Sequence, residues 1–133
     1  MLFRSEPAGY MASARALALS SIDEGLPMVV LEALSLGLPV LAADCPAGGV
    51  RAALVGRGAF DPARAEAEPT SSGVLLPVPR ADSQNSLALW RAAFADALHD
   101  DKRWQAWRDG ALASAERFSP SRALERWLEI LHA

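Results

Sequence analysis

The fold of this chain is decided by a loop and the apolar segment after it, Ser20-Ser21-Ile22-Asp23-Glu24-Gly25-Leu26-Pro27-Met28-Val29-Val30-Leu31-Glu32-Ala33. Proline suits the first position of a helix, because its φ is already fixed near the helical value and its missing N–H would have no partner there. We therefore predict a helix from Pro27 to about Leu36. Glu24 then lies just before this helix, and Glu32 lies on it, about 7 to 8 Å along the axis from the first amides.

The start of this helix is suited to an anion. Its first N–H groups have no partner inside the helix and, with the positive end of the helix dipole, favour a negative group such as a diphosphate. Glu32 is unusual here because apolar residues surround it, and a buried unpaired charge is strongly disfavoured. The alternative to a binding role is that Glu32 and Ser35, one turn apart, form a narrow solvated stripe.

The chain continues with a helix end, a strand and a turn, Leu36-Gly37-Leu38-Pro39-Val40-Leu41-Ala42-Ala43-Asp44-Cys45-Pro46-Ala47-Gly48-Gly49. Gly37 is typical of a helix end, and the apolar run from Val40 to Ala43 predicts a short buried strand. The Gly/Pro-rich turn from Asp44 to Gly49 then lies at the carboxyl end of that strand, where open α/β sheets bind their ligands.

These segments together resemble the donor-binding domain of retaining GT-B glycosyltransferases of group 1, also called family 4. The chain matches three patterns of that family between Ser21 and Gly48, namely S-x-x-E-G-x-P, E-A-x-x-x-G-x-P-V and D-C-P-x-G. Gly73 to Pro79 is similar to the next strand and loop of that family, and Asp82 to Leu128 to its closing helices. The resemblance implies a partial Rossmann-like α/β fold, the C-terminal half-domain of GT-B enzymes.

The resemblance also implies roles for individual residues. Glu24 would contact hydroxyls of the transferred sugar and is the candidate catalytic residue, and Glu32 would bind the ribose. The residues implied in substrate binding are Gly25, Leu26, Pro27, Met28, Val29 and Glu32. The implied substrate is a nucleotide-sugar, expected to be a UDP-hexose or UDP-hexosamine, for transfer to a glycan or lipid-linked glycan. No metal-ligand spacing occurs in the sequence, so we expect neither a metal nor another cofactor.

Helices and strands alternate in the first part of the chain. We predict a helix at Pro7–Ala14, a strand at Ala16–Ser20 and a second crossover helix at Gly49–Val55. This alternation predicts right-handed βαβ units and a sheet of about three parallel strands with flanking helices. The segment Gly56–Ser72 has no clean period and is predicted to be a surface loop. The whole chain, residues 1–133, is then one partial donor-binding domain, with a βαβαβ core at 1–79 and a helical C-terminus at 80–133.

The C-terminal part carries aromatic and leucine residues at helical spacing. Ser119 is a good N-cap for a last helix with Pro120 at its first position. Apolar residues lie at helical spacing on this helix and on the two helices before it: Leu87, Trp90, Phe94 and Leu98, then Trp104 and Trp107, and on the last helix Leu124, Trp127, Leu128 and Leu131. We predict that this apolar stripe packs in the core rather than facing a membrane, because an amphipathic helix buries itself with such spacing.

The match covers the second half of a donor domain only. We therefore expect the acceptor domain, the first strands of the donor domain and the basic residues for the diphosphate to come from elsewhere in a longer enzyme or from a partner chain. Arg51 is the one basic residue close to the turn. This chain alone is expected to bind donor weakly and to be inactive, and the open edge of the strand at residues 16–20 invites self-association. A split-enzyme subunit and a non-catalytic remnant or interaction module are the alternatives.

Composition excludes several other classes of protein. The chain has 133 residues, of which 51% are hydrophobic and 22% charged, with a formal net charge of −3. An acidic balance argues against nucleic-acid binding, which needs clustered Lys and Arg. The single cysteine, Cys45, allows no internal disulfide and is predicted to be a small apolar filler. No signal-peptide core is present, and Glu32, Gly37 and Pro39 interrupt the longest apolar run, so we expect no transmembrane helix. We expect a cytoplasmic protein, with peripheral attachment to the inner membrane face as the alternative.

Overall fold

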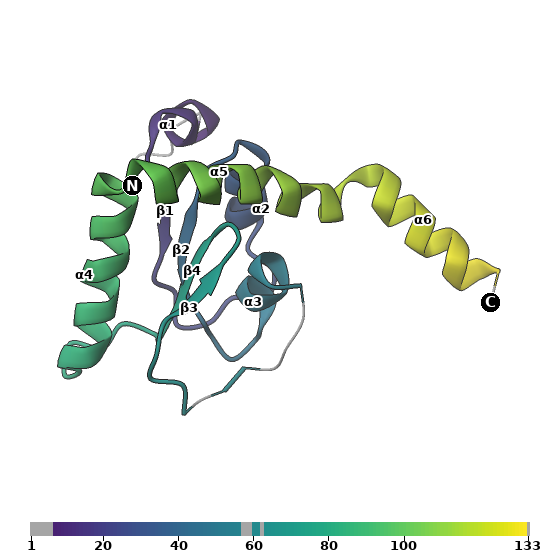
Figure 1. Ribbon diagram of the computed structural model, residues 1–133. Coiled ribbons are helices and arrows are strands. Elements are labelled where there is room, and N and C mark those ends of the chain that lie inside the picture. The colour runs from purple at the N-terminus through teal and green to yellow at the C-terminus, as the bar shows by residue number, and fades with distance from the viewer. Residues whose placement is uncertain (1–6, 57–59, 62, 133) are drawn as a thin grey trace.

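A four-stranded, mostly parallel sheet forms the centre of the protein in the computed structural model, which describes residues 7–56, 60–61 and 63–132. The strand order is β1-β2-β4-β3, and three neighbouring strands are parallel: β1 (Leu17–Leu19), β2 (Val40–Ala43) and β4 (Gly73–Leu76). The fourth strand, β3 (Glu68–Thr70), pairs antiparallel with β4 at the other edge. The predicted α/β fold with a partial Rossmann-like sheet is therefore confirmed (Figure 1).

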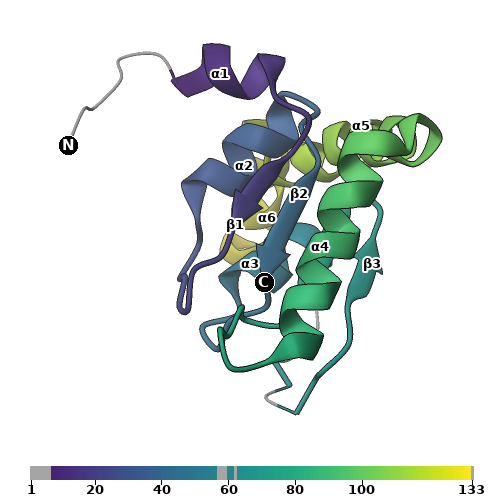
Figure 2. The ribbon, with the colours of Figure 1, turned by 90° about the vertical axis from the view of Figure 1, so that its left-hand side faces the viewer.

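Helices cover both faces of this sheet (Figure 2). One face carries α2 (Met28–Ser35) and α3 (Gly49–Leu54), and the other carries α4 (Gln84–His99). The helix α5 (Asp101–Ala115) runs across the end of the sheet and contributes to both layers, through Ala111 on the first face and Trp107 on the second. The short helix α1 (Pro7–Ser13) has no buried residue.

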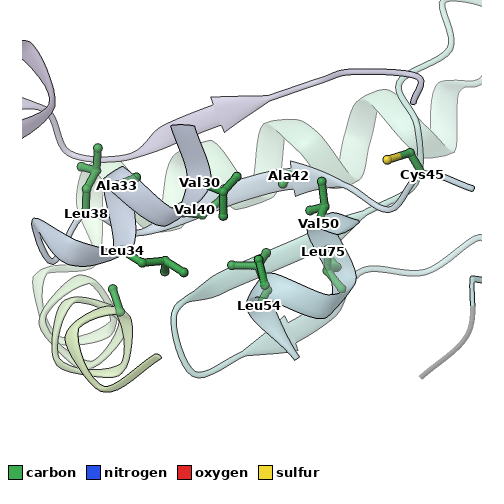
Figure 3. Packing of buried hydrophobic residues seen from close by; sticks show 12 residues of the cluster. Val30, Ala33, Leu34, Leu38, Val40, Ala42, Cys45, Val50, Leu54 and Leu75 are labelled. Carbon is green, nitrogen blue, oxygen red and sulfur yellow. The ribbon is translucent and has the colours of Figure 1, made fainter. Parts of the chain in front are cut away.

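The two central strands are buried on both sides, which explains their uninterrupted apolar sequences. Val40 and Ala42 on β2 pack with Val30 and Leu34 of α2, as Figure 3 shows, whereas Leu41 packs on the α4 side. Alternate residues of β2 thus serve two cores, as the period of two in a strand requires. The predicted strand at residues 40–43 is confirmed without change.

Helix α2 ends as predicted but begins one residue later than predicted. Gly37 adopts a left-handed φ of 68°, and the N–H of Leu38 donates to the carbonyl of Ala33 at 2.9 Å, a glycine-based C-cap. At the other end, Pro27 has an extended ψ of 107° and is the N-cap, so the helix starts at Met28. Proline suits the N-cap as well as the first helical position, because it has no N–H that needs a partner and its fixed φ is compatible with both positions.

Two predictions about the rest of the chain need correction. Within the segment predicted as a loop, residues 56–72, Glu68–Thr70 forms the antiparallel strand β3. The last helix, α6 (Pro120–Leu131), follows a 3-10 turn, η1 (Glu116–Phe118), and has no buried residue. Ser119 caps α6 as predicted, by accepting from the N–H of Arg122.

The prediction that the apolar stripe packs in the core is confirmed only in part. Trp90 on α4 and Trp107 on α5 are buried and Trp104 is half-buried, whereas Leu87, Phe94 and Leu98 of the stripe on α4 are exposed. Trp127 and its leucine neighbours on α6 are exposed, and the helix points away from the sheet (Figure 1). The spacing indicates that one face of α6 needs a partner, but it carries no information about which surface provides one.

Candidate functional site

The candidate site lies at the carboxyl edge of the sheet, where β1 and β2 lead into the loops before α2 and α3. The two loops contact each other through the backbone N–H of Ala47, which donates to Asp23 Oδ1 at 3.3 Å. A Cβ added at Gly49 would lie 1.2 Å from the carbonyl oxygen of Gly25. Glycine is therefore required at position 49, because no side chain fits between the start of α3 and the loop that carries Glu24.

Glu24 is half-buried on the first of these loops. The hydroxyl of Ser21 donates a hydrogen bond of 2.6 Å to Glu24 Oε1. Oε2 has no partner among the described residues, so it is available to accept a hydrogen bond from a ligand. The S-x-x-E spacing of the sequence thus serves to hold the carboxylate through a serine three residues earlier.

The start of α2 is not capped by any side chain. The N–H of Val30 donates to the carbonyl of Pro27 at 3.0 Å. In the part of the chain that the structure describes, the N–H groups of Met28 and Val29 have no hydrogen-bond partner, as expected for the first turn of a helix. Of the predicted binding segment, Gly25, Leu26 and Met28 are exposed, whereas Pro27 is buried and has no N–H to offer.

Glu32 is exposed on the second turn of α2 and lines a groove of about 510 Å³ between α2 and the C-terminal end of α5 with η1. Leu31 and Ser35 lie on the same wall of this groove. Glu24 is not among the residues that line it. The structure therefore places the two glutamates on the same loop–helix unit but not in this one groove, and their roles stay predictions.

Arg51, the one basic residue that the sequence places close to the turn after β2, is engaged in a network inside the protein. Arg51 is only 3% exposed. Its Nε donates to Asp44 Oδ1 at 3.1 Å, and one Nη donates both to Asp44 Oδ2 and, at 2.7 Å, to Glu68 Oε2. The hydrogen bonds to Asp44, in the first place, raise the pKa of Arg51 above its usual range. Nε and one Nη of the guanidinium are therefore engaged by carboxylates of the same chain.

The partners of Arg51 extend this buried network to the surface. Glu68 also pairs with Arg64 at 3.0 Å. The hydrogen bond from Arg51 lowers the pKa of Glu68 from its usual value, and the charge of Arg64 adds to this effect. The sequence contained no signal for this network, because Glu68 comes from a segment that was predicted to be a loop. Asp44, directly after β2, is thus linked through Arg51 to α3, which carries Arg51, and to β3, which carries Glu68.

Cys45, directly after Asp44, belongs to the core beneath α2 and α3. Burial raises the pKa of its thiol, which keeps it in the neutral form. This agrees with the predicted role as a small apolar filler. Among the described residues, no three His, Cys, Asp or Glu side chains gather closely enough to hold a metal ion. In the same residues, none of the helices combines the length and apolar character that crossing a bilayer requires.

The chain matches a known protein family. The family model described as "Glycosyl transferases group 1" matches residues 2–71, slightly more than half of the 133 residues. This region contains β1, α2, β2 and α3 with both loops of the carboxyl edge. No curated protein matches the chain. The matched region thus includes every residue of the candidate site, and the chain belongs to the group 1 glycosyltransferases.

Proposed function

We propose that this chain binds a nucleotide-sugar donor at the carboxyl edge of its sheet and contributes to retaining transfer of a hexosyl or hexosaminyl group. The observation that carries this proposal is the pair of unpartnered amides at Met28 and Val29, placed directly after the half-buried carboxylate of Glu24. The membership in group 1 glycosyltransferases supports it, since the matched region includes these residues.

The proposed arrangement assigns one part of the donor to each feature. The diphosphate lies at the start of α2, where the free amides and the helix dipole favour negative charge by roughly 0.3 to 2 kcal/mol. Oε2 of Glu24 accepts a hydrogen bond from a hydroxyl of the sugar, while Ser21 holds Oε1. Glu32 accepts hydrogen bonds from the ribose hydroxyls. Bonds between hydroxyls and a carboxylate are charge-assisted, so both glutamates contribute to specificity.

The charges around this edge indicate that the chain alone holds the donor weakly. Among the described residues, the arginines near the ends of β2 and β4 are engaged by carboxylates: Arg51 by Asp44 and Glu68, Arg64 by Glu68, and Arg80 by Asp82. A diphosphate normally also receives charge-assisted bonds from basic side chains. We propose that these come from an acceptor domain or a partner chain, and that the isolated chain binds donor in the millimolar range, roughly 4 kcal/mol.

Amide-resolved NMR titration tests the proposed site directly. Uridine, UDP, UDP-glucose and UDP-N-acetylglucosamine are added to the 15N-labelled chain, and the amide signals of Met28 and Val29 are followed. We expect the three diphosphates to shift these signals and uridine to leave them nearly unchanged, because the amides contact the diphosphate. Shifts confined to other elements, or no shift with any diphosphate at millimolar concentration, would overturn the proposal.

Two conservative variants separate the roles of the glutamates. Glu24→Gln should remove the difference between UDP and a UDP-sugar, whereas Glu32→Gln should weaken uridine, UDP and UDP-sugar alike. Glu129→Gln on α6 is the matched control and should change none of these affinities. Submicromolar affinity of the unmodified chain for a UDP-sugar, measured by calorimetry, would refute the electrostatic argument above.

A further inference from the structure

The loop that carries Glu24 has few hydrogen bonds of its own. Among the described residues, no backbone–backbone hydrogen bond holds residues 21–26 in place. The hydroxyl of Ser21 binds Glu24 Oε1 from within the same loop, so this bond does not fix the loop to the rest of the protein. Segments with few hydrogen bonds to the fold open locally at a low free-energy cost. The position of Glu24 therefore depends on contacts between this loop and its neighbours.

The turn after β2 makes two contacts with the backbone of this loop. Burial raises the pKa of the Cys45 thiol, and a hydrogen bond from the backbone of Glu24 lowers this pKa in part, so the thiol lies against the loop. Figure 3 shows the Cys45 side chain at the end of β2. Gly49 in turn approaches the carbonyl of Gly25 so closely that no side chain fits between them. Neither contact involves a side chain of the loop.

Asp23 makes the third contact between the turn and the loop, and it does so through its side chain. Its Oδ1 accepts a hydrogen bond from the N–H of Ala47 at 3.3 Å. In the part of the chain that the structure describes, no other side chain of residues 21–26 is hydrogen-bonded to another segment. Asp23 directly precedes Glu24, so its anchoring restrains the backbone from which the Glu24 side chain extends.

We propose that Asp23 is a positioning residue of the donor site, which accepts the N–H of Ala47 and thereby holds Glu24 in the orientation that meets the sugar. This inference rests on the proposed function, in which Glu24 Oε2 binds a hydroxyl of the sugar. Asp23 acts through Glu24 and does not itself touch the donor. Hydrogen bonds weaken steeply when their geometry is distorted. Releasing the loop at Asp23 therefore weakens the bond from Glu24 to the sugar while the fold is retained.

The role of Asp23 requires a hydrogen-bond acceptor but no charge. A donor diphosphate is anionic, so a second carboxylate beside the loop repels it. The side-chain oxygen of asparagine accepts a hydrogen bond as a carboxylate oxygen does, without the charge. Asp23→Asn therefore keeps the contact with Ala47, whereas Asp23→Ala removes it. The two variants separate positioning from charge.

Hydrogen exchange and amide signals of the ligand-free, 15N-labelled chain test the contact itself. Asp23→Ala should speed exchange of the Ala47 amide severalfold and shift the amide signals of Glu24 and Gly25, whereas Asp23→Asn should largely preserve both. Asp61→Ala is the matched control, because Asp61 is also exposed and accepts a backbone N–H, that of the residue two positions later, at 2.9 Å. This control should change none of these signals, and circular dichroism checks that each variant is folded.

Titration of the same variants with UDP and UDP-glucose tests the positioning of Glu24. Asp23→Ala should reduce the difference in affinity between the two ligands severalfold, in the direction of Glu24→Gln. Asp23→Asn should keep this difference and bind both ligands more tightly, because the repelling charge is gone. A merely stabilising residue would not alter the ratio of the two affinities in a folded variant.

The outcomes distinguish this inference from the proposed function. An Ala47 amide and loop signals that do not respond to Asp23→Ala would overturn the role of Asp23, as would failure of Asp23→Asn to preserve them. A chain that binds UDP-glucose through Glu24 and keeps the full difference from UDP in Asp23→Ala would overturn it as well, and the proposed function would stand. A chain whose amides respond to neither ligand would overturn the proposed function and, with it, the positioning of a sugar by Asp23.

Discussion

Replacing Arg51 by methionine should destabilise the protein strongly without touching a ligand site. The substitution keeps much of the side-chain volume but removes the guanidinium that binds Asp44 and Glu68. Asp44, which is itself buried, would keep a carboxylate with no cationic partner. Removing one partner of a buried ion pair costs about 3 to 5 kcal/mol. Domains have total stabilities of about 5 to 15 kcal/mol, so Arg51→Met removes about a fifth or more of the total.

Urea unfolding followed by far-UV circular dichroism measures this loss, and a second variant controls for it. Adding Asp44→Asn to Arg51→Met removes the unpaired charge, so the double variant should regain about 1 to 3 kcal/mol relative to Arg51→Met. Amide-resolved titration with UDP provides the functional control. A loss below about 1 kcal/mol for Arg51→Met would refute the structural role. Loss of the UDP-induced shift at Met28 in a stable, folded Arg51→Met variant would instead place Arg51 at the donor site.

Three further predictions follow from the same region. Gly49→Ala should destabilise the protein by about 2 kcal/mol or more, because the new Cβ clashes with the carbonyl of Gly25, and it should shift the amide signals of that loop in NMR spectra. Gly48→Ala is the control. Gly48 has a left-handed φ of 75° but open space around its Cβ, so this variant should lose about 1 to 2 kcal/mol of stability and leave the loop in place. The hydrogen bond from Arg51 lowers the pKa of Glu68. The stabilisation from this carboxylate is therefore complete above its unfolded pKa of about 4.3 and should decline as the pH falls through the lower pKa of the folded state. Urea unfolding between pH 6 and pH 3 measures this decline, and Glu68→Gln should flatten it. Cys45, which is buried and has a raised pKa, should react with a thiol reagent at pH 8 only as fast as the protein opens, so fast labelling of the folded chain would contradict the structure.

Residues that end or cap helices, together with apolar runs, predicted most of the helices and strands. Gly37 ends α2, and Ser119 caps α6, since both act through contacts within a few residues. The strand β2 was predicted from its apolar run alone, because a strand buried on both faces needs no alternation. These features depend on the local chain, and the sequence records them directly.

The features that could not be predicted depend on distant contacts. β3 consists of Glu68, Pro69 and Thr70, a sequence with low strand propensity, and it forms because it pairs with β4 across a short turn. In that turn, Thr70 Oγ1 accepts a hydrogen bond from the N–H of Ser72 at 3.2 Å. The orientation of Arg51 in turn depends on β3, since Glu68 lies 17 residues further along the chain. Because this short strand was not predicted, the network that engages Arg51 was not predicted either.

The candidate site is better equipped to recognise hydroxyls than to neutralise charge. In the described part of the chain, Glu24 and Glu32 both keep carboxylate oxygens without a partner, whereas Arg51, Arg64 and Arg80 bind carboxylates of the same chain. In the proposed function, the paired charges near the carboxyl edge serve stability, and the two glutamates serve selection among ligands. Adding a single unpaired cation at the edge is the informative perturbation. Ala47→Arg, on the exposed loop after β2, should strengthen UDP binding several-fold while leaving uridine binding unchanged, because only the diphosphate gains from the new charge. An equal gain for both ligands would contradict the proposal that the diphosphate lies at the start of α2.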